Sequence, residues 1–221
     1  MARTPTPARR RPGRPAADSA DLRLRLLDAA MALFGSSGIS ATPLSAIARK
    51  AKVTPALMHY YFGNKERLVD ALVEERLMPL LGKVAGQIAE HAGDPAVAIP
   101  AFVRVVIATL GQNPWLPPLW IREVLTEGGQ LRERVLGRVA PLVGLRVRDM
   151  AAAAQQRGQL NQDLDPRLLM VSLMGLTVFA FASESIWRTV FNANDITPDD
   201  LTRHVLALLT RGLELRHAPN P

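Results

Sequence analysis

The stretch TPLSAIARKAKVTPALMHYYFGNKERL, residues 42–68, decides the fold of this chain. It contains two Thr-Pro pairs, Thr42-Pro43 and Thr54-Pro55, and a short run of apolar residues at helical spacing follows each pair. A threonine oxygen can cap the free N–H groups at the start of a helix, and proline suits the first turn because its missing N–H would have no partner there. The stretch therefore predicts two short helices, one after each pair, separated by a tight turn.

Longer helices are predicted on both sides of this stretch. From Asp21, apolar residues recur at spacings of three and four until GSSG, residues 35–38, where glycine signals a helix end. Asn64 is placed to cap a long helix that runs from Lys65 to about Glu90. A longer helix followed by two short ones forms a helix-turn-helix, whose second short helix lies in the major groove of DNA.

The remainder of the chain is predicted to be helical without a β-sheet, because no segment shows sustained two-residue alternation. Helical segments are expected near residues 94–111, 117–127, 130–157, 165–190 and 198–215. We therefore predict an all-α fold in three parts: a disordered basic arm (1–20), a three-helix helix-turn-helix domain (21–68) and a larger helical bundle (69–221).

Positive charge is concentrated in the first third of the chain. Residues 1–68 carry 12 Lys and Arg against 4 Asp and Glu, whereas residues 69–221 carry 15 against 16, so the N-terminal part accounts for the formal net charge of +7. A basic module on a near-neutral body favours a polyanionic partner for that module, with nucleic acid ahead of acidic lipid.

Several other classes of protein are disfavoured. The chain has no cysteine, which fits a reducing cytoplasm, and no clean apolar segment follows the basic N-terminus as a signal peptide would require. The uncharged run Leu168–Ser183 has 16 residues, short of the roughly 20 that a membrane span needs. Phosphate-binding glycine loops, HExxH and GxSxG motifs are missing from the sequence. We therefore expect a cytoplasmic protein that is not an enzyme and has no cofactor, metal site or membrane partner.

The second short helix supplies most candidates for contact with double-stranded DNA. Its first residues, which can pack against thymine methyl groups but offer no bidentate hydrogen-bonding pair, are Thr54, Pro55, Ala56 and Leu57. His59, Tyr60 and Tyr61 are expected on the free face, where they can donate hydrogen bonds to phosphates. Met58 and Phe62, four residues apart, are expected to face the core.

Four further residues are candidates for phosphate contacts. Thr42 and Ser45 lie at the start of the supporting helix, Lys52 lies in the turn, and Lys65 starts the next helix, where backbone N–H groups are free. The alternative is that the threonines are only helix caps and that the rings form an ordinary aromatic cluster. Capping by Thr42 and Thr54 does not exclude DNA contact.

The quoted stretch resembles the DNA-binding segment of the TetR family of bacterial transcriptional regulators. The matching positions are Thr42, Ile47-Ala48, Ala51, Val53-Thr54, Tyr61-Phe62 and Lys65-Glu66 with Leu68. The resemblance covers about 45 residues, from Leu26 to Leu72, and beyond them only the all-helical architecture agrees. It implies a homodimeric repressor that binds a palindromic operator and is released when a small molecule occupies the C-terminal domain.

Two positions depart from the family pattern. Lys52 stands where the family usually has a turn glycine, and a left-handed backbone there would cost on the order of 1 kcal/mol. His59 stands where a tyrosine is frequent, and a phosphate contact by an imidazole would depend on pH if the ring must be charged.

The segment RRRPGRP, residues 9–15, offers a second means of binding DNA. A Pro-flanked Gly-Arg segment is narrow and extended, so Arg14 could point into an AT-rich minor groove. The alternative is a solvated basic tail that adds only nonspecific attraction.

The C-terminal two thirds are expected to bind an effector and to dimerise. Helices near 167–189 and 199–215 could pair with their symmetry mates in a four-helix interface. Candidates for contact with an apolar or amphipathic effector combine large apolar surface with a few polar groups: Trp115, Trp120, Arg122, Met150, Met174, Phe181 and Trp187. Each could instead be simple core. The rival functions are a nonspecific nucleic-acid-binding or scaffold protein whose helical domain only oligomerises, and an enzyme that has kept the helical body.

Overall fold

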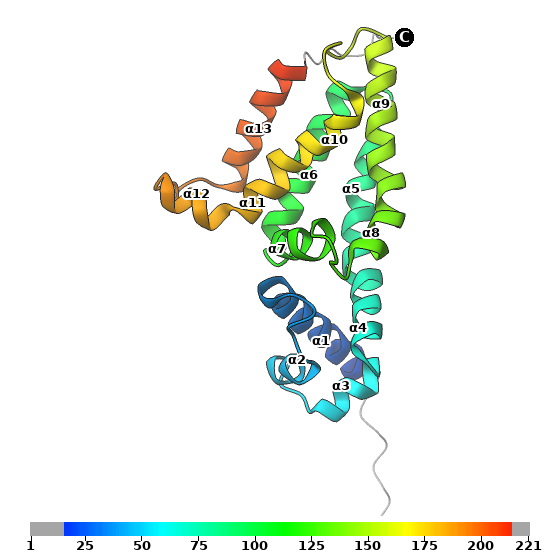
Figure 1. Ribbon diagram of the computed structural model, residues 1–221, viewed down its shortest axis with the longest axis vertical. Helices are drawn as coiled ribbons and strands as arrows, with labels where there is room; N and C mark the ends of the chain where they lie inside the picture. The colour runs from blue at the N-terminus through cyan, green and yellow to red at the C-terminus, as the bar shows by residue number, and fades with distance from the viewer. Residues whose placement is uncertain (1–15, 214–221) are drawn as a thin grey trace, which may run out of the picture.

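The computed structural model describes residues 16–213, whose regular secondary structure is helical without a strand (Figure 1). The N-terminal elements are α1 (Ala16–Ser37), α2 (Leu44–Lys50), α3 (Pro55–Phe62) and α4 (Lys65–Leu72). The larger domain contains α5 (Met78–Glu90), α6 (Pro95–Gln112), α7 (Leu116–Trp120), α8 (Arg132–Val139), α9 (Leu145–Gln156), α10 (Pro166–Met174), α11 (Ala180–Ala182), α12 (Glu184–Val190) and α13 (Pro198–Leu213). Four π-helical turns directly follow α4, α7, α8 and α10: η1 (Val73–Leu77), η2 (Ile121–Leu125), η3 (Ala140–Gly144) and η4 (Gly175–Phe179).

The predicted helix-turn-helix is present, and two of its three predicted caps are confirmed. Thr54 Oγ1 accepts a hydrogen bond from Leu57 N at 3.4 Å and begins α3, and Asn64 Oδ1 accepts one from Arg67 N at 2.9 Å and begins α4. The prediction for Thr42 is wrong, because Pro43 is the N-cap residue of α2 and makes no side-chain cap bond.

The boundary of α1 also differs from the prediction. The helix begins at Ala16, so residues 16–20, predicted to be disordered, are helical. Residues 1–15 lie outside the described part of the chain. The predicted long helix from Lys65 to Glu90 is confirmed as α4, η1 and α5 in succession, and it leads from the small N-terminal domain into the larger one (Figure 1).

Helix α6 is the central helix of the larger domain and packs against both α5 and α13. Its N-cap is Asp94, whose carboxylate accepts a hydrogen bond from Ala96 N at 2.9 Å. Among residues 16–213 it is the one unbroken helix long and apolar enough to cross a membrane, and half of it is buried inside the protein. Such burial is what the core helix of a globular domain requires.

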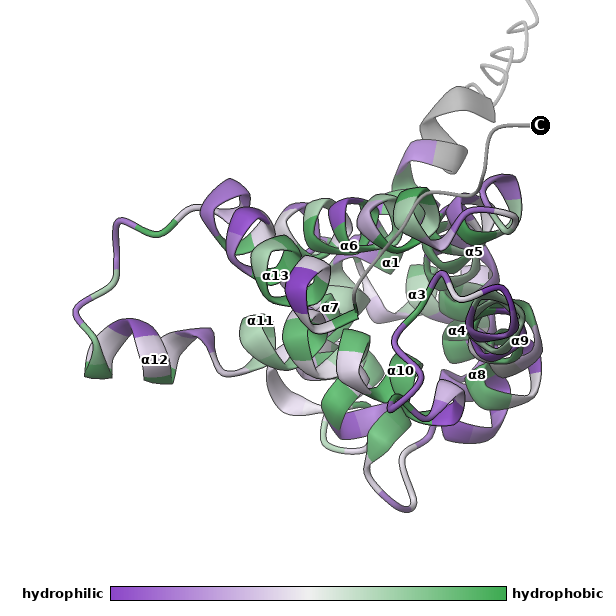
Figure 2. Cartoon of the chain, turned by 90° about the horizontal axis from the view of Figure 1, so that it is seen from above, coloured by the Kyte–Doolittle hydropathy of each residue, from purple (hydrophilic) through white to green (hydrophobic). Residues whose placement is uncertain are grey.

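The predicted single helix 165–190 is broken at Ser183. The segment Pro166–Ala182 and helix α12 meet there at an angle of 73°. As a result, α12 and the loop after it project from the body of the molecule (Figures 1 and 2). The sequence contains neither proline nor glycine at this break, so the pattern predicted a continuous helix.

Candidate DNA-binding surface and apolar cavity

Helix α3 presents the two faces that its sequence predicts. Met58 and Phe62 are buried, whereas His59 and Tyr60 are exposed and 81% of Tyr60 is accessible to solvent. The first residues of the helix are also open to solvent: Thr54, Pro55 and Ala56 are exposed and Leu57 is half-buried. The end of the helix that would enter a major groove is therefore free to do so.

The aromatic rings of α3 divide into exposed and supporting ones. The rings of Tyr60 and Tyr61 meet edge to face, with centroids 5.5 Å apart, and Tyr61 is half-buried. On the other side, the guanidinium of Arg23 in α1 lies 4.6 Å from the centroid of the Phe62 ring. Tyr60 thus reaches outward from a helix that Phe62 fixes to α1.

The imidazole of His59 is held in one tautomer. Its Nδ1 lies 2.7 Å from the carbonyl oxygen of Gly63, which can only accept, so Nδ1 must carry the proton. Gly63, with φ of 70°, ends α3 in the left-handed region. Nε2 is therefore the remaining contact atom of the ring, and it can donate to a phosphate oxygen only when the imidazole is protonated.

The turn between α2 and α3 has the left-handed backbone at Lys52 for which strain was expected. This residue has φ of 57°, a left-handed conformation that a glycine would adopt without steric cost. Its side chain is exposed beside the start of α3, as a phosphate contact would require.

The other residues predicted to contact DNA differ in exposure and in hydrogen-bond partners. Thr42 is only 3% exposed and its hydroxyl donates to Gly38 O at 2.7 Å, so the buried side chain does not reach toward DNA. Ser45 is exposed near the start of α2. Lys65 Nζ donates to Ser40 O at 3.0 Å and fastens the start of α4 to the loop before α2. Arg14 lies outside the described residues.

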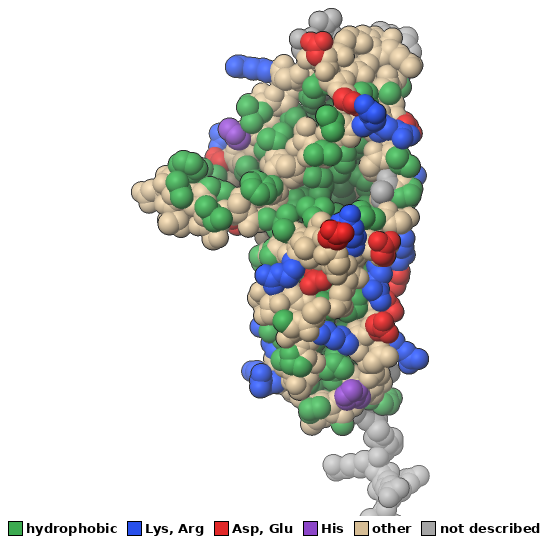
Figure 3. Space-filling view, in the orientation of Figure 1, with side chains coloured by type: hydrophobic (Ala, Val, Ile, Leu, Met, Phe, Trp, Pro, Cys, Tyr) green, Lys and Arg blue, Asp and Glu red, His purple; other side chains and the backbone are tan. Residues whose placement is uncertain are grey.

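The larger domain contains an apolar cavity of about 570 Å³. Its wall is formed by parts of α5, α6, α7 and α8, with η2, η3, α10 and η4 completing it. Figure 3 shows hydrophobic side chains gathered in a hollow on this domain. Of the 22 lining residues, none carries a charge, and only Thr109 and Trp120 have a polar side-chain atom. The cavity volume falls within the ~300–1,000 Å³ typical of ligand pockets.

Two of the seven effector candidates, Trp120 and Met174, line this cavity. Trp115 instead packs on Gly35 of α1, where an added Cβ would lie 2.8 Å from the Trp115 carbonyl oxygen. Arg122 donates to Ser36 O at 3.1 Å, at the junction with α1. Met150 is buried in α9 and is not part of the cavity wall.

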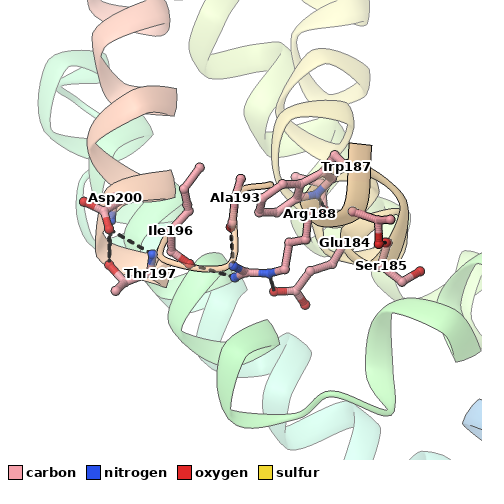
Figure 4. Close-up of polar contacts among 10 residues, drawn as sticks. Glu184, Ser185, Trp187, Arg188, Ala193, Ile196, Thr197 and Asp200 are labelled. Carbon is pink, nitrogen blue, oxygen red and sulfur yellow. Dashed lines mark hydrogen bonds and ion pairs between the residues drawn. The ribbon is translucent and has the colours of Figure 1, made fainter. Parts of the chain in front are cut away.

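Phe181 and Trp187 lie beside a separate crevice of about 10 Å³. There the Arg188 guanidinium donates to the carbonyl oxygens of Ala193 and Ile196, at 2.8 and 2.7 Å, and pairs with Glu184 (Figure 4). It also lies 4.7 Å from the centroid of the Trp187 ring. These contacts hold the loop that follows α12, and neither Phe181 nor Trp187 lines the apolar cavity.

Most of the cavity wall consists of leucines and valines that sequence reasoning did not single out. The available signal was in α6, where Phe102, Val106, Thr109 and Leu110 face the cavity while Ala98, Ile99 and Val103 are also buried. A helix with buried residues over so much of its circumference has neighbours on several sides.

One cavity-lining turn also contacts the helix-turn-helix domain. Trp120, Ile121 and Leu125 line the cavity, whereas the Glu123 carboxylate between them points to the loop after α1. Its Oε1 accepts a hydrogen bond from Ile39 N at 2.7 Å and its Oε2 accepts one from Gln130 N at 3.1 Å, and the residue is 5% exposed. A side chain at Gly129 would collide with the Glu123 carbonyl, because an added Cβ would lie 2.4 Å from that oxygen.

Helix α8 makes a second connection of the same kind. Val135 and Val139 line the cavity, while Arg134 Nε donates to Asp70 of α4 at 2.8 Å. Arg138 pairs with Glu74 in η1, and its hydrogen bonds hold the pKa of the Glu74 carboxyl below its usual range.

The segment of α4 and η1, which we call the connector, also forms ion pairs with α1 on its opposite side. Glu75 pairs with Arg23, and Arg76 pairs with Asp28 at 2.7 Å. Each of these exposed pairs contributes little to stability, about 0–1 kcal/mol. Together they place α4 and η1 between α8 and α1.

This arrangement defines a helix-turn-helix DNA-binding protein with an attached, cavity-bearing helical domain. A sequence profile described as "Bacterial regulatory proteins, tetR family" matches residues 26–72, and one described as "Tetracyclin repressor-like, C-terminal domain" matches residues 95–209. The chain belongs to the TetR family, as its helix-turn-helix sequence suggested.

Relatives and solved structures agree with this assignment. HTH-type transcriptional regulator BetI of Rhizobium meliloti (strain 1021) is 41% identical over 86 residues, covering 38% of this chain and 40% of that protein. The chain thus spans about two fifths of the length of the curated relatives it matches. Ketosteroid transcriptional regulator KstR2 of Mycobacterium tuberculosis superimposes with a TM-score of 0.72 at 19% identity, covering 86% of this chain and 94% of that one. FadR of Bacillus subtilis in complex with stearoyl-CoA gives 0.62 at 20% identity, covering 86% and 98%.

Proposed function

We propose that the protein is a dimeric, cytoplasmic repressor that binds operator DNA and releases it when a small molecule fills the apolar cavity. The observation that carries this proposal is that two elements of the cavity wall, η2 and α8, also contact the DNA-binding domain or its connector. A scaffold that only oligomerises would have no use for a cavity of about 570 Å³.

The DNA contacts are assigned to the exposed surface around α3. His59, Tyr60 and Lys52 would contact phosphates, and the first turn of the helix would pack against base edges. The side chain of Thr42 is excluded from this set because it is buried.

The dimer interface is assigned to the exposed apolar surface of the C-terminal helices. From α10 to the residue after α12, six large apolar side chains are exposed: Leu168, Val171, Phe179, Ile186, Val190 and Phe191. Leu208 of α13 is exposed as well. A monomer rarely leaves so many together, so a second copy of the chain is the expected cover. In that dimer the two α3 helices would reach major grooves about 34 Å apart or a multiple of that distance.

Release would follow from the connection of the cavity wall to the DNA-binding domain. A ligand that displaces η2 or α8 shifts the loop held by Glu123 and the connector held by Arg134 and Arg138. The two α3 helices then no longer match the half-site spacing. Couplings of this kind amount to about 1–3 kcal/mol, or roughly 5–150-fold in affinity.

Footprinting on the DNA upstream of the protein's own gene tests this proposal. We expect a short palindromic footprint that weakens when a neutral apolar compound such as 1-dodecanol is added. Gly144→Phe, which places a ring in the cavity, should abolish this response. Gly137→Phe is the matched control, because both glycines leave free space around an added Cβ but only Gly144 lines the cavity.

Two results would contradict the proposal. Uniform protection of the DNA would favour the nonspecific scaffold. A palindromic footprint that 1-dodecanol weakens equally in wild type and Gly144→Phe would show that DNA release does not depend on the cavity.

A further inference from the structure

We propose that the natural ligand of the cavity is an uncharged lipophilic molecule, such as a neutral alcohol, ester or ketone, and not a fatty-acid or other organic anion. The inference rests on the cavity of the proposed function and specifies the chemistry of its occupant. It concerns binding alone, so it can be tested without DNA.

The cavity wall offers nothing that would stabilise an ionised group. All 22 lining residues are uncharged, and the two polar side-chain atoms among them, Thr109 Oγ1 and Trp120 Nε1, are fully buried and have no hydrogen-bond partner. Because these atoms are inaccessible even with the cavity empty, they lie behind its surface. A ligand inside therefore meets hydrocarbon almost everywhere.

The arginines nearest in sequence to the lining residues of α8 are already engaged. Arg132 donates to the carbonyl oxygen of Leu125 at 3.0 Å, Arg134 pairs with Asp70, and Arg138 pairs with Glu74. Arg122, next to the lining residue Ile121, donates to Ser36 O. None of these cations is left over to pair with an anionic headgroup.

The large residues at the open side of the cavity are apolar as well. Leu125, Leu136, Val171 and Phe179 line the cavity and are exposed in the single protomer, and Val171 and Phe179 also belong to the apolar surface assigned to the dimer interface. A carboxylate placed among them would lose water without gaining a partner, so an acid would enter in its protonated form. At pH 8 a carboxyl with an ordinary pKa near 4.3 is protonated in fewer than about one molecule in 10³.

Ligands of equal chain length but different headgroup charge test whether the cavity prefers neutral molecules. Nile red, a neutral fluorescent dye, is bound to the full-length protein and displaced by 1-dodecanol below its solubility limit, or by laurate or dodecylammonium below their micelle concentrations. We expect 1-dodecanol to bind at least about 100-fold more tightly than laurate at pH 8. Laurate affinity should fall about tenfold per unit between pH 6.5 and 8.5, whereas 1-dodecanol affinity should stay constant. Equal affinities, a laurate affinity independent of pH, or failure of all three probes to bind would overturn the proposal.

A charge placed in the wall provides a second measurement. Met174→Lys puts an ammonium at the cavity and should raise the ratio of laurate to 1-dodecanol affinity at least tenfold. Val97→Lys, at an exposed position of α6 outside the cavity, should leave the ratio unchanged. Both variants are first shown to melt cooperatively. An unchanged ratio in folded Met174→Lys would show that headgroups lie outside the cavity and would overturn the proposal.

A different result would refute the proposed function without refuting the proposed ligand class. If 1-dodecanol binds as expected but leaves the operator footprint unchanged, release by the ligand is refuted while the ligand class stands.

Discussion

Replacement of Glu123 by glutamine should loosen the junction between the cavity and the DNA-binding domain. The carboxylate uses one oxygen for Ile39 N and the other for Gln130 N, and it is almost fully buried. A glutamine side chain has nearly the same shape but only one acceptor oxygen. One of the two backbone N–H groups must therefore face an amide NH₂ or remain unpaired.

The cost can be worked out from these two hydrogen bonds. Leaving one buried donor unsatisfied destabilises a protein by about 1–3 kcal/mol. For a chain of this size, each kcal/mol lowers the melting temperature by about 2–4 °C, so the variant should melt about 2–12 °C lower. Glu127→Gln makes the same chemical change at an exposed position four residues away and should leave the melting temperature within about 1 °C.

Glu123→Gln also tests whether Glu123 transmits ligand binding in the cavity to the DNA-binding domain. Nile red binding should be retained, because Glu123 does not line the cavity. The effect of 1-dodecanol on operator affinity should shrink by at least half on a logarithmic scale. Normal melting together with full ligand response would refute the reasoning, since it would mean that the two hydrogen bonds neither stabilise the junction nor transmit through it.

Four other substitutions have expected outcomes. Thr109→Val removes a buried hydroxyl without a partner and should raise the melting temperature by about 2–4 °C, corresponding to about 1 kcal/mol; a fall would show that the hydroxyl is satisfied. Lys52→Gly should stabilise the fold by up to about 1 kcal/mol in urea unfolding while weakening operator binding, and destabilisation would contradict the left-handed strain. His59→Gln should abolish the component of operator affinity that strengthens from pH 8 to 5.5 in the wild type, and parallel pH profiles would exclude a charged imidazole. Hydrogen bonds from Arg167 lower the pKa of the Asp165 carboxyl to about 2, so the contribution of this carboxylate to stability is present above pH 3.8 and lost toward pH 2. The matched variant Asp165→Asn keeps a capping side chain. Its free energy of unfolding should converge with that of the wild type as the pH falls from 3.8 to 2.

The helix-turn-helix could be predicted because its determinants are local. Thr54 and Asn64 cap helices that begin one residue later, and the four-residue spacing of Met58 and Phe62 places both in the core. Thr42 has the same sequence signature, yet its hydroxyl donates to Gly38 O. That contact depends on the path of the preceding loop, which the Thr-Pro pair does not encode.

Features that depend on distant partners were missed. The bend at Ser183 is accompanied by a loop that Arg188 fixes through carbonyl oxygens five and eight residues downstream, beyond the range of helix periodicity. The cavity is harder still to predict, because Leu80, Val106 and Val139 have the pattern of ordinary core residues. Only the spacing of the helices leaves a volume between them unfilled.

The π-helical turn η2 interleaves two kinds of residue in one short segment. Ile121 and Leu125 face the cavity, whereas Arg122 between them contacts the last turn of α1 and Glu123 holds the loop after it. Substitutions at the first pair can alter ligand preference while the junction stays intact, so the two properties can evolve separately. Deletion of a single residue before Glu123 would turn the following side chains in other directions, so that the Glu123 carboxylate would no longer meet the loop after α1. Selection should therefore accept changes of side chain in this turn far more readily than changes of its length.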